Sequence, residues 1–195
     1  IIIAEAGVNH NGNFELAKDL AVKAKETGAD YVKYQSFITE SNITMEAPKA
    51  VYQTETTDIH ETQFEMLKKL EFSLSETKEL KQFCDSIKMG FLTTPAENEN
   101  IELVEEMKLD FIKIASESIV NYQLLEKVGS LKGKIIMSTG MSTIDEIDAA
   151  LKVLIESGTN RQNIILLHCN SQYPTLFKDV NLRAMATLKK HFCLQ

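Results

Sequence analysis

The sequence predicts an α/β fold built on parallel strands, because two kinds of pattern alternate along the whole chain. Short apolar runs rich in β-branched and aromatic residues are typical of buried strands, and amphipathic stretches with capping residues are typical of helices. Strict alternation of the two implies parallel strands joined by right-handed crossovers. At 195 residues, the chain is also long enough to bury a sizeable core.

Six short apolar runs are expected to form the strands. They cover residues 1–4, 31–34, 90–93, 111–114, 134–137 and 163–167. Helices are expected between and after them, at 14–27, 74–87, 97–107, 144–157 and about 182–192. In the first helix, Leu16, Leu20, Ala21 and Ala24 are expected to share the buried face. Two capping boxes, Ser73 to Glu76 and Thr143 to Glu146, mark the start of later helices.

Two architectures fit this order, an open doubly wound sheet and a (β/α) barrel. Six strand-helix units are fewer than the eight of a closed barrel, which typically needs about 250 residues. No GxGxxG follows the first strand, which disfavours a dinucleotide-binding sheet. Residues 38–72, between the second strand and its helix, are too many for an ordinary connection and are typical of an active-site face.

Composition excludes several classes of function. The 21 basic and 28 acidic residues give a formal net charge of −7, which argues against nucleic acid or an anionic membrane as the main partner. No uncharged apolar stretch approaches the ~20 residues that a membrane helix needs. Cys84, Cys169 and Cys193 form neither a CxxC pair nor a disulfide framework, which indicates a reducing cytoplasm.

The carboxyl ends of the predicted strands carry polar or ionisable residues, and parallel α/β folds place their function there. Lys33 and Lys113 lie inside otherwise apolar runs, where a charge is costly without a partner or ligand. With nearby hydroxyls they predict a site for a phosphate or carboxylate on one rim. The alternative is that these strand ends are polar only because they are solvated.

Four other strand-end residues each leave two interpretations open. Glu5 is expected to be a buried carboxylate, either ion-paired with a lysine or catalytic. His10 lies in an Asn- and Gly-rich turn and could bind a ligand or cap the next helix. His168 is interpreted as a hydrogen-bonded core histidine rather than a metal ligand. Cys169 is expected to be inert rather than reactive.

The two ends of the chain are unusual. The sequence opens inside an apolar run with no initiator Met, and it stops directly after a helical pattern with no polar tail. We therefore expect a piece of a longer protein.

Seven strand-end motifs, taken in order, resemble the sialic acid synthase family, which includes N-acetylneuraminate, legionaminate, pseudaminate and spore-coat polysaccharide synthases. The motifs are IAEAGVNHNG at 3–12, GADYVKYQ at 28–35, TTP at 93–95, KIAS at 113–116, STGM at 138–141, HCNSQYPT at 168–175 and VNLR at 180–183. The resemblance implies a TIM (β/α)8-type barrel, of which this chain holds about six of eight units. It implies one incomplete barrel domain over residues 1–195, without the family's C-terminal antifreeze-like domain.

The resemblance also implies the chemistry, which is condensation of phosphoenolpyruvate with an N-acetylmannosamine-type sugar to give a sialic-type acid and phosphate. The positions that hold phosphoenolpyruvate in the family are matched by Lys33, Thr94, Lys113, Ser116, Ser138, Ser171 and Tyr173. Glu5 and Gln35 match groups at the reacting centre, and Ser118 stands where the family often has a carboxylate for the sugar. The family's divalent metal, Mn²⁺ or Mg²⁺, is expected to have histidine ligands beyond this chain. A cytoplasmic homodimer is implied for the whole protein.

Two rival functions remain open from the sequence. One is another phosphoenolpyruvate or sugar-phosphate barrel enzyme, such as an aldolase with a Schiff-base lysine. The other is a fragment that binds an anion and does not turn over.

Overall fold

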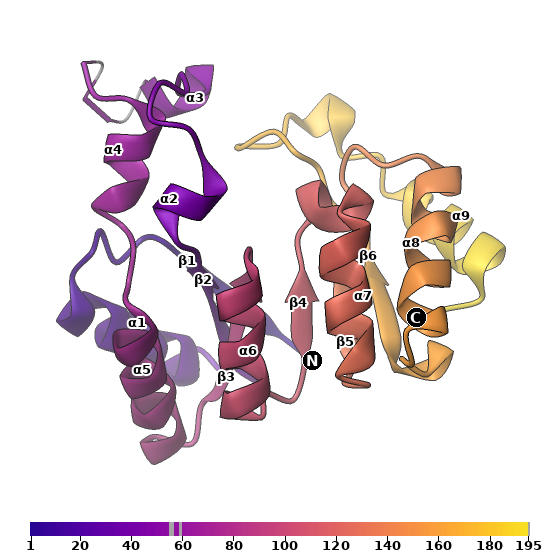
Figure 1. The fold of residues 1–195 in the computed structure, drawn as a ribbon, viewed down its shortest axis with the longest axis horizontal. Helices are drawn as coiled ribbons and strands as arrows, with labels where there is room; N and C mark the ends of the chain where they lie inside the picture. The colour runs from indigo at the N-terminus through magenta and orange to yellow at the C-terminus, as the bar shows by residue number, and fades with distance from the viewer. Residues whose placement is uncertain (55–56, 59, 195) are drawn as a thin grey trace. The chain divides into compact units, whose positions relative to one another are not determined.

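The computed structural model describes residues 1–54, 57, 58 and 60–194, and it confirms an α/β fold with parallel strands (Figure 1). The chain divides into two compact units, Ile1–Leu109 and Asp110–Gln195. Each unit holds a three-stranded parallel sheet. The eight-unit barrel stays a prediction. None of the described helices combines the length and apolar character that a membrane crossing requires.

The sheet of the first unit has the strand order β1-β2-β3. Its strands are β1 (Ile3–Gly7), β2 (Tyr31–Ser36) and β3 (Gly90–Pro95). The predicted start of β1 is wrong, since Ile1 and Ile2 are 77% and 65% exposed and precede the strand. β1 and β2 instead extend further toward their carboxyl ends than predicted, so Glu5 and Gln35 lie within strands.

Helices α1 (Phe14–Glu26), α5 (Leu74–Ser86) and α6 (Asn98–Met107) complete the first unit. Helix α1 buries Ala17, Ala21 and Ala24, so small side chains let it approach the sheet closely. The predicted place of Leu16 on this face is wrong, because Leu16 is exposed. The predicted capping box at Ser73 and Glu76 is confirmed at the start of α5.

Within the described residues of the long segment 38–72, the short helices are α2 (Thr39–Asn42), α3 (Val51–Thr54) and α4 (Gln63–Lys68). Polar contacts hold it together. Lys49 Nζ lies 2.9 Å from Glu61 Oε1, and the two side chains are only 3% and 11% exposed. Glu71 accepts hydrogen bonds from the backbone N–H and the hydroxyl of Thr39, at 2.9 and 2.6 Å. The segment therefore has internal structure.

The second unit has the strand order β4-β5-β6, formed by Ile112–Ile114, Ile135–Ser138 and Ile164–Leu167. Its α-helices are α7 (Tyr122–Ser130), α8 (Ile144–Glu156) and α9 (Arg183–Phe192). Short 3₁₀ helices cover Ser116–Val120, Arg161–Asn163 and Phe177–Asp179. Helices α7 and α8 lie side by side (Figure 1).

Sequence patterns locate α8 but give no range for α7. The predicted capping box of Thr143 and Glu146 is confirmed, and α8 buries Ile147, Leu151 and Leu154 at helical spacing. Helix α7 has only nine residues, which is shorter than the window over which helical periodicity becomes clear.

Candidate functional site

The first group of predicted site residues meets around Lys33, whose side chain is 9% exposed. Its Nζ lies 3.0 Å from Glu5 Oε1 and donates a hydrogen bond to Thr94 Oγ1 at 3.1 Å. It also donates to the backbone carbonyl of Tyr34 at 3.5 Å. We call Glu5, Lys33 and Thr94 the Lys33 cluster.

The second group meets around Lys113, a buried residue on β4. Its Nζ donates to Ser138 Oγ and to the carbonyl of Ile114, both at 2.7 Å. The Gly140 backbone N–H donates to Ser116 Oγ at 2.9 Å, and the Cys169 thiol donates to Ser138 Oγ at 3.3 Å. We call Lys113, Ser116, Ser138, Gly140 and Cys169 the Lys113 cluster.

The strand register explains why both lysines meet a hydroxyl. Lys33 pairs with Leu92 in the β2–β3 register, and Thr94 comes two residues later. Lys113 pairs with Ile136 in the β4–β5 register, and Ser138 again comes two residues later. Residues two apart on a strand point to the same face. Each lysine therefore reaches a hydroxyl on the adjacent strand, two residues closer to the carboxyl end than its register partner.

Glu5 is ion-paired, as one of its two interpretations predicted, but it is not buried. It pairs with Lys33 in the β1–β2 register, which puts the two side chains next to each other. Its side chain is 55% exposed, so the expectation of a buried carboxylate is wrong. The reason is its place on β1, at an edge of the three-stranded sheet of the first unit. The ion pair leaves the catalytic interpretation open.

The remaining predicted residues are not members of either cluster. Gln35 is exposed on β2, in register with Thr94. Ser118 is half-buried in the 3₁₀ helix that follows β4. Ser171 and Tyr173 lie in an exposed stretch after β6, where Tyr173 is 67% exposed. Their predicted roles in holding substrate stay predictions.

The two strand-end histidines have different surroundings. His10 is 1% exposed and stacks on Phe72, with ring centroids 4.1 Å apart. Its Nδ1 accepts the Gly12 backbone N–H at 3.1 Å, and burial lowers its pKa. The cap of α1 is Asn13, so His10 does not cap that helix. His168 Nε2 donates to the carbonyl of Val180 at 2.8 Å, which confirms the hydrogen bond. The expected place of His168 in the core is wrong, because the residue is only half-buried.

Two polar groups near the strand ends were not predicted from the sequence. One is the contact of Cys169 with Ser138, which puts a thiol expected to be inert into the Lys113 cluster. The other is Glu97, whose Oε1 is buried without a hydrogen-bond partner among the described residues. Asn100 donates to its Oε2 at 2.6 Å, and burial raises the pKa of this carboxyl. The sequence feature that could have identified Glu97 is its position two residues after the end of β3.

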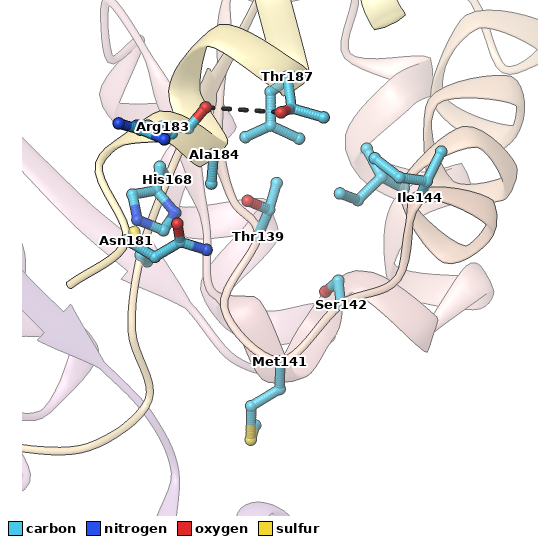
Figure 2. A pocket seen from close by; sticks show the side chains of 12 residues that line it. Thr139, Met141, Ser142, Ile144, His168, Asn181, Arg183, Ala184 and Thr187 are labelled. Carbon is cyan, nitrogen blue, oxygen red and sulfur yellow. Dashed lines mark hydrogen bonds between the residues drawn. The ribbon is translucent and has the colours of Figure 1, made fainter. Parts of the chain in front are cut away.

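A cavity of about 400 Å³ lies within the second unit, and Cys169 is one of the residues that line it. Figure 2 shows this cavity. Thr139 and His168 line it, between the start of α9 and the loop that leads to α8. Both side chains already have hydrogen-bond partners, since the Thr139 hydroxyl donates to the Leu167 carbonyl at 2.9 Å. Cys169 therefore both lines the cavity and contacts Ser138.

The described residues do not supply a metal site. No three His, Cys, Asp or Glu side chains among them lie together in a way that could hold a metal ion. His10 and His168 both have other partners. The divalent metal that the family resemblance implies, with histidine ligands beyond this chain, stays a prediction.

A parallel α/β fold with buried lysines at its strand ends is typical of enzymes that act on anionic substrates. Residues 20–195 match the NeuB family, and the chain belongs to that family. It is 47% identical to the N,N'-diacetyllegionaminic acid synthase of Campylobacter jejuni, covering 100% of this chain and 58% of that relative. It is 39% identical to the synthase of the same name from Legionella pneumophila, covering 99% and 55%. The chain thus spans about half the length of these curated relatives.

Solved structures support the barrel-type α/β fold. The N-acetylneuraminic acid synthetase of Leptospira borgpetersenii, crystallised with citrate, superimposes with a TM-score of 0.82 at 30% identity, covering 97% of this chain and 60% of that one. The spore coat protein SpsE of Bacillus subtilis gives 0.79 at 27%, covering 99% and 50%. A truncated 3-deoxy-D-arabino-heptulosonate 7-phosphate synthase of Thermotoga maritima gives 0.66 at 17%, covering 97% and 60%, which is a likeness of fold alone.

Proposed function

We propose that the whole protein condenses phosphoenolpyruvate with an N-acetylmannosamine-type sugar, forming a nonulosonic acid and releasing phosphate. The names of its relatives support this reaction class, since they include synthases of legionaminic acid, pseudaminic acid and N-acetylneuraminate 9-phosphate. The observation that carries the proposal is the buried Lys113 ammonium held 2.7 Å from the Ser138 hydroxyl at the carboxyl end of a strand.

The clusters offer what a phosphate and a carboxylate need. Each holds an ammonium group beside a hydroxyl, and such charge-assisted donors bind oxyanions more strongly than neutral ones do. Burial strengthens the attraction, because the effective dielectric constant is lower than in water. We assign phosphoenolpyruvate binding to Lys33, Thr94, Lys113, Ser116, Ser138, Ser171 and Tyr173, and sugar contact to Ser118.

The reaction makes one carbon–carbon bond, and at C2 it replaces the bond to the phosphate oxygen with a bond to an oxygen from water. The C3 carbon of phosphoenolpyruvate attacks the aldehyde carbon of the open-chain sugar, and the aldehyde oxygen gains a proton. Water then adds at C2, which has become an oxocarbenium, and loses a proton. The resulting tetrahedral intermediate loses inorganic phosphate, which leaves the 2-keto acid.

The exposed polar side chains of β1 and β2 take the roles at the reacting centre. The Glu5 carboxylate accepts the proton that water loses on adding to C2, and its 3.0 Å ion pair with Lys33 orients it. The Gln35 amide donates a hydrogen bond to the oxygen of the sugar aldehyde as negative charge develops there.

The test compares Lys113→Ala with Lys152→Ala in the whole protein. Lys152 lies on α8 and makes only an exposed, 3.9 Å pair with Glu156, so it is the matched control. Phosphate release from phosphoenolpyruvate and N-acetylmannosamine is expected to fall by about 10²–10³-fold in kcat/KM for Lys113→Ala and to stay unchanged in the control. Equal rates in the two variants would overturn the proposal.

A second measurement distinguishes the proposed condensation from the chemistry of a Schiff-base aldolase. Borohydride reduction in the presence of both substrates traps an imine covalently on an aldolase lysine. The proposed condensation forms no bond to lysine, so mass spectrometry is expected to find no adduct on Lys33 or Lys113. A substrate-dependent adduct on either residue would show the aldolase chemistry.

A further inference from the structure

We propose that Cys169 is a positioning residue that aims the Ser138 hydroxyl at bound phosphoenolpyruvate, an inference that rests on the proposed function. The two residues are neighbours because of the sheet register. Ser138 pairs with Leu167 across β5 and β6, and Cys169 comes two residues after Leu167. The Cys169 thiol reaches Ser138 Oγ at 3.3 Å.

The hydrogen-bonding capacity of Ser138 carries the inference. A serine hydroxyl can accept two hydrogen bonds and donate one. Lys113 Nζ donates to Ser138 Oγ at 2.7 Å, and the Cys169 thiol donates at 3.3 Å. These two bonds use both acceptor positions, so only the hydroxyl proton of Ser138 is left.

That proton has no acceptor among the described residues, although Ser138 is only 6% exposed. A buried donor without an acceptor costs about 1–3 kcal/mol, so such groups call for a ligand or another explanation. An oxygen of the substrate phosphate or carboxylate supplies the missing acceptor. Cys169 thus directs Ser138 to donate outward, toward the anion.

A thiol suits this task because it is a weak acceptor. Sulfur competes poorly for the Ser138 proton, while its S–H still occupies the second lone pair of the oxygen. Without the thiol, Ser138 is free to rotate, and part of the alignment that favours the anion is lost. If Cys169 served only to fill space, valine could replace it, because valine has a similar shape but no proton to donate.

The test measures the dissociation constant of phosphoenolpyruvate by calorimetry for Cys169→Val, Cys169→Ser and Ser138→Ala in the whole protein. Cys169→Val is expected to weaken binding by about fivefold to tenfold. Cys169→Ser keeps a donor but adds a stronger acceptor for the Ser138 proton, so it is expected to weaken binding less than Cys169→Val does. In the Ser138→Ala background, adding Cys169→Val is expected to change nothing further, because the thiol acts through Ser138. Cys193→Ser, at an exposed thiol, is the control.

The outcomes separate this inference from the proposed function. If Ser138→Ala weakens binding but Cys169→Val does not, only the role of Cys169 is overturned. If Cys169→Val binds like the parent while Cys169→Ser is impaired, packing explains the residue and the inference is again overturned. If Ser138→Ala itself leaves the dissociation constant unchanged, the assigned binding site and the inference fail together. Thermal melting of each variant checks that the fold is kept.

Discussion

The two lysine clusters use the same geometry with different third partners. In each, a lysine donates to the carbonyl of the next residue and to a hydroxyl two positions past its register partner on the next strand. The Lys33 cluster adds the half-exposed carboxylate of Glu5, whereas the Lys113 cluster adds the thiol of Cys169 beside Ser138. The shared part is suited to binding an anion, and the added part gives each cluster its own role.

The largest expected effect of this difference is at Glu5. Glu5→Gln removes the group assigned to accept a proton, and general bases contribute about 10²–10⁴-fold, so kcat is expected to fall at least 10²-fold. The same change leaves the Lys33 charge without its carboxylate at 3.0 Å, so KM for phosphoenolpyruvate is expected to stay equal or fall. Steady-state phosphate release checks both values. An unchanged kcat would reduce Glu5 to a structural ion pair.

A second prediction concerns the glycine of the Lys113 cluster. A Cβ on Gly140 would lie 2.9 Å from Ser116 Oγ, so Gly140→Ala pushes that hydroxyl away from its backbone N–H partner. KM for phosphoenolpyruvate is expected to rise about tenfold, the equivalent of one net hydrogen bond. Gly133→Ala is the control. Gly133 precedes β5, which Gly140 follows, and its added Cβ would contact only the Ile112 side chain. If both variants raise KM equally, the effect comes from strand packing and not from Ser116.

The sequence was enough to predict that buried lysines and hydroxyls lie at the carboxyl ends of the strands. A lysine inside an apolar run signals a buried charge, and parallel strands bring their carboxyl ends to one edge. Lys33 and Lys113 follow from this pattern, whereas Thr94 and Ser138 are assigned as site residues through the family resemblance.

The third partners depend on contacts that no local pattern encodes. Cys169 meets Ser138 only through the β5–β6 register, and a cysteine after an apolar strand is most often inert. Glu97 lies between Ala96 and Asn98 in a polar stretch of the sequence, and nothing in that local pattern indicates its burial. Edge exposure at Glu5 depends in the same way on which strands adjoin β1.

The strands that supply the hydroxyls, β3 and β5, lead to glutamates with opposite pH behaviour. Burial raises the pKa of Glu97 above its usual 4.5, so folding takes up a proton and the free energy of unfolding falls as pH rises from 4.5 through the raised value. The backbone N–H and hydroxyl of Thr143 lower the pKa of Glu146, so its contribution is lost as pH falls below 4.5.

Urea unfolding of two variants checks this contrast. Glu97→Gln removes a buried charge and is expected to stabilise the protein by about 1 kcal/mol at pH 7.5, with the difference vanishing near pH 4. Glu146→Gln is expected to destabilise the protein at pH 7.5, with the difference shrinking on acidification. Parallel pH profiles for the two variants would contradict the assigned surroundings of both carboxyls.

The smallest effect at neutral pH is expected at His10, in the turn that follows β1. His10→Phe keeps a ring on Phe72 but loses the acceptor of the Gly12 N–H, so its cost is about 1 kcal/mol or less. The effect of His10 on stability becomes measurable at acidic pH, because burial lowers its pKa below the usual 6.5. The unfolded state then binds more protons than the folded state, so the parent loses stability as pH falls below 6.5. His10→Phe is expected to flatten that slope in urea unfolding between pH 5 and pH 7, while His60→Gln, at an exposed position, leaves it unchanged. A slope that persists in His10→Phe would mean that another group titrates in this range.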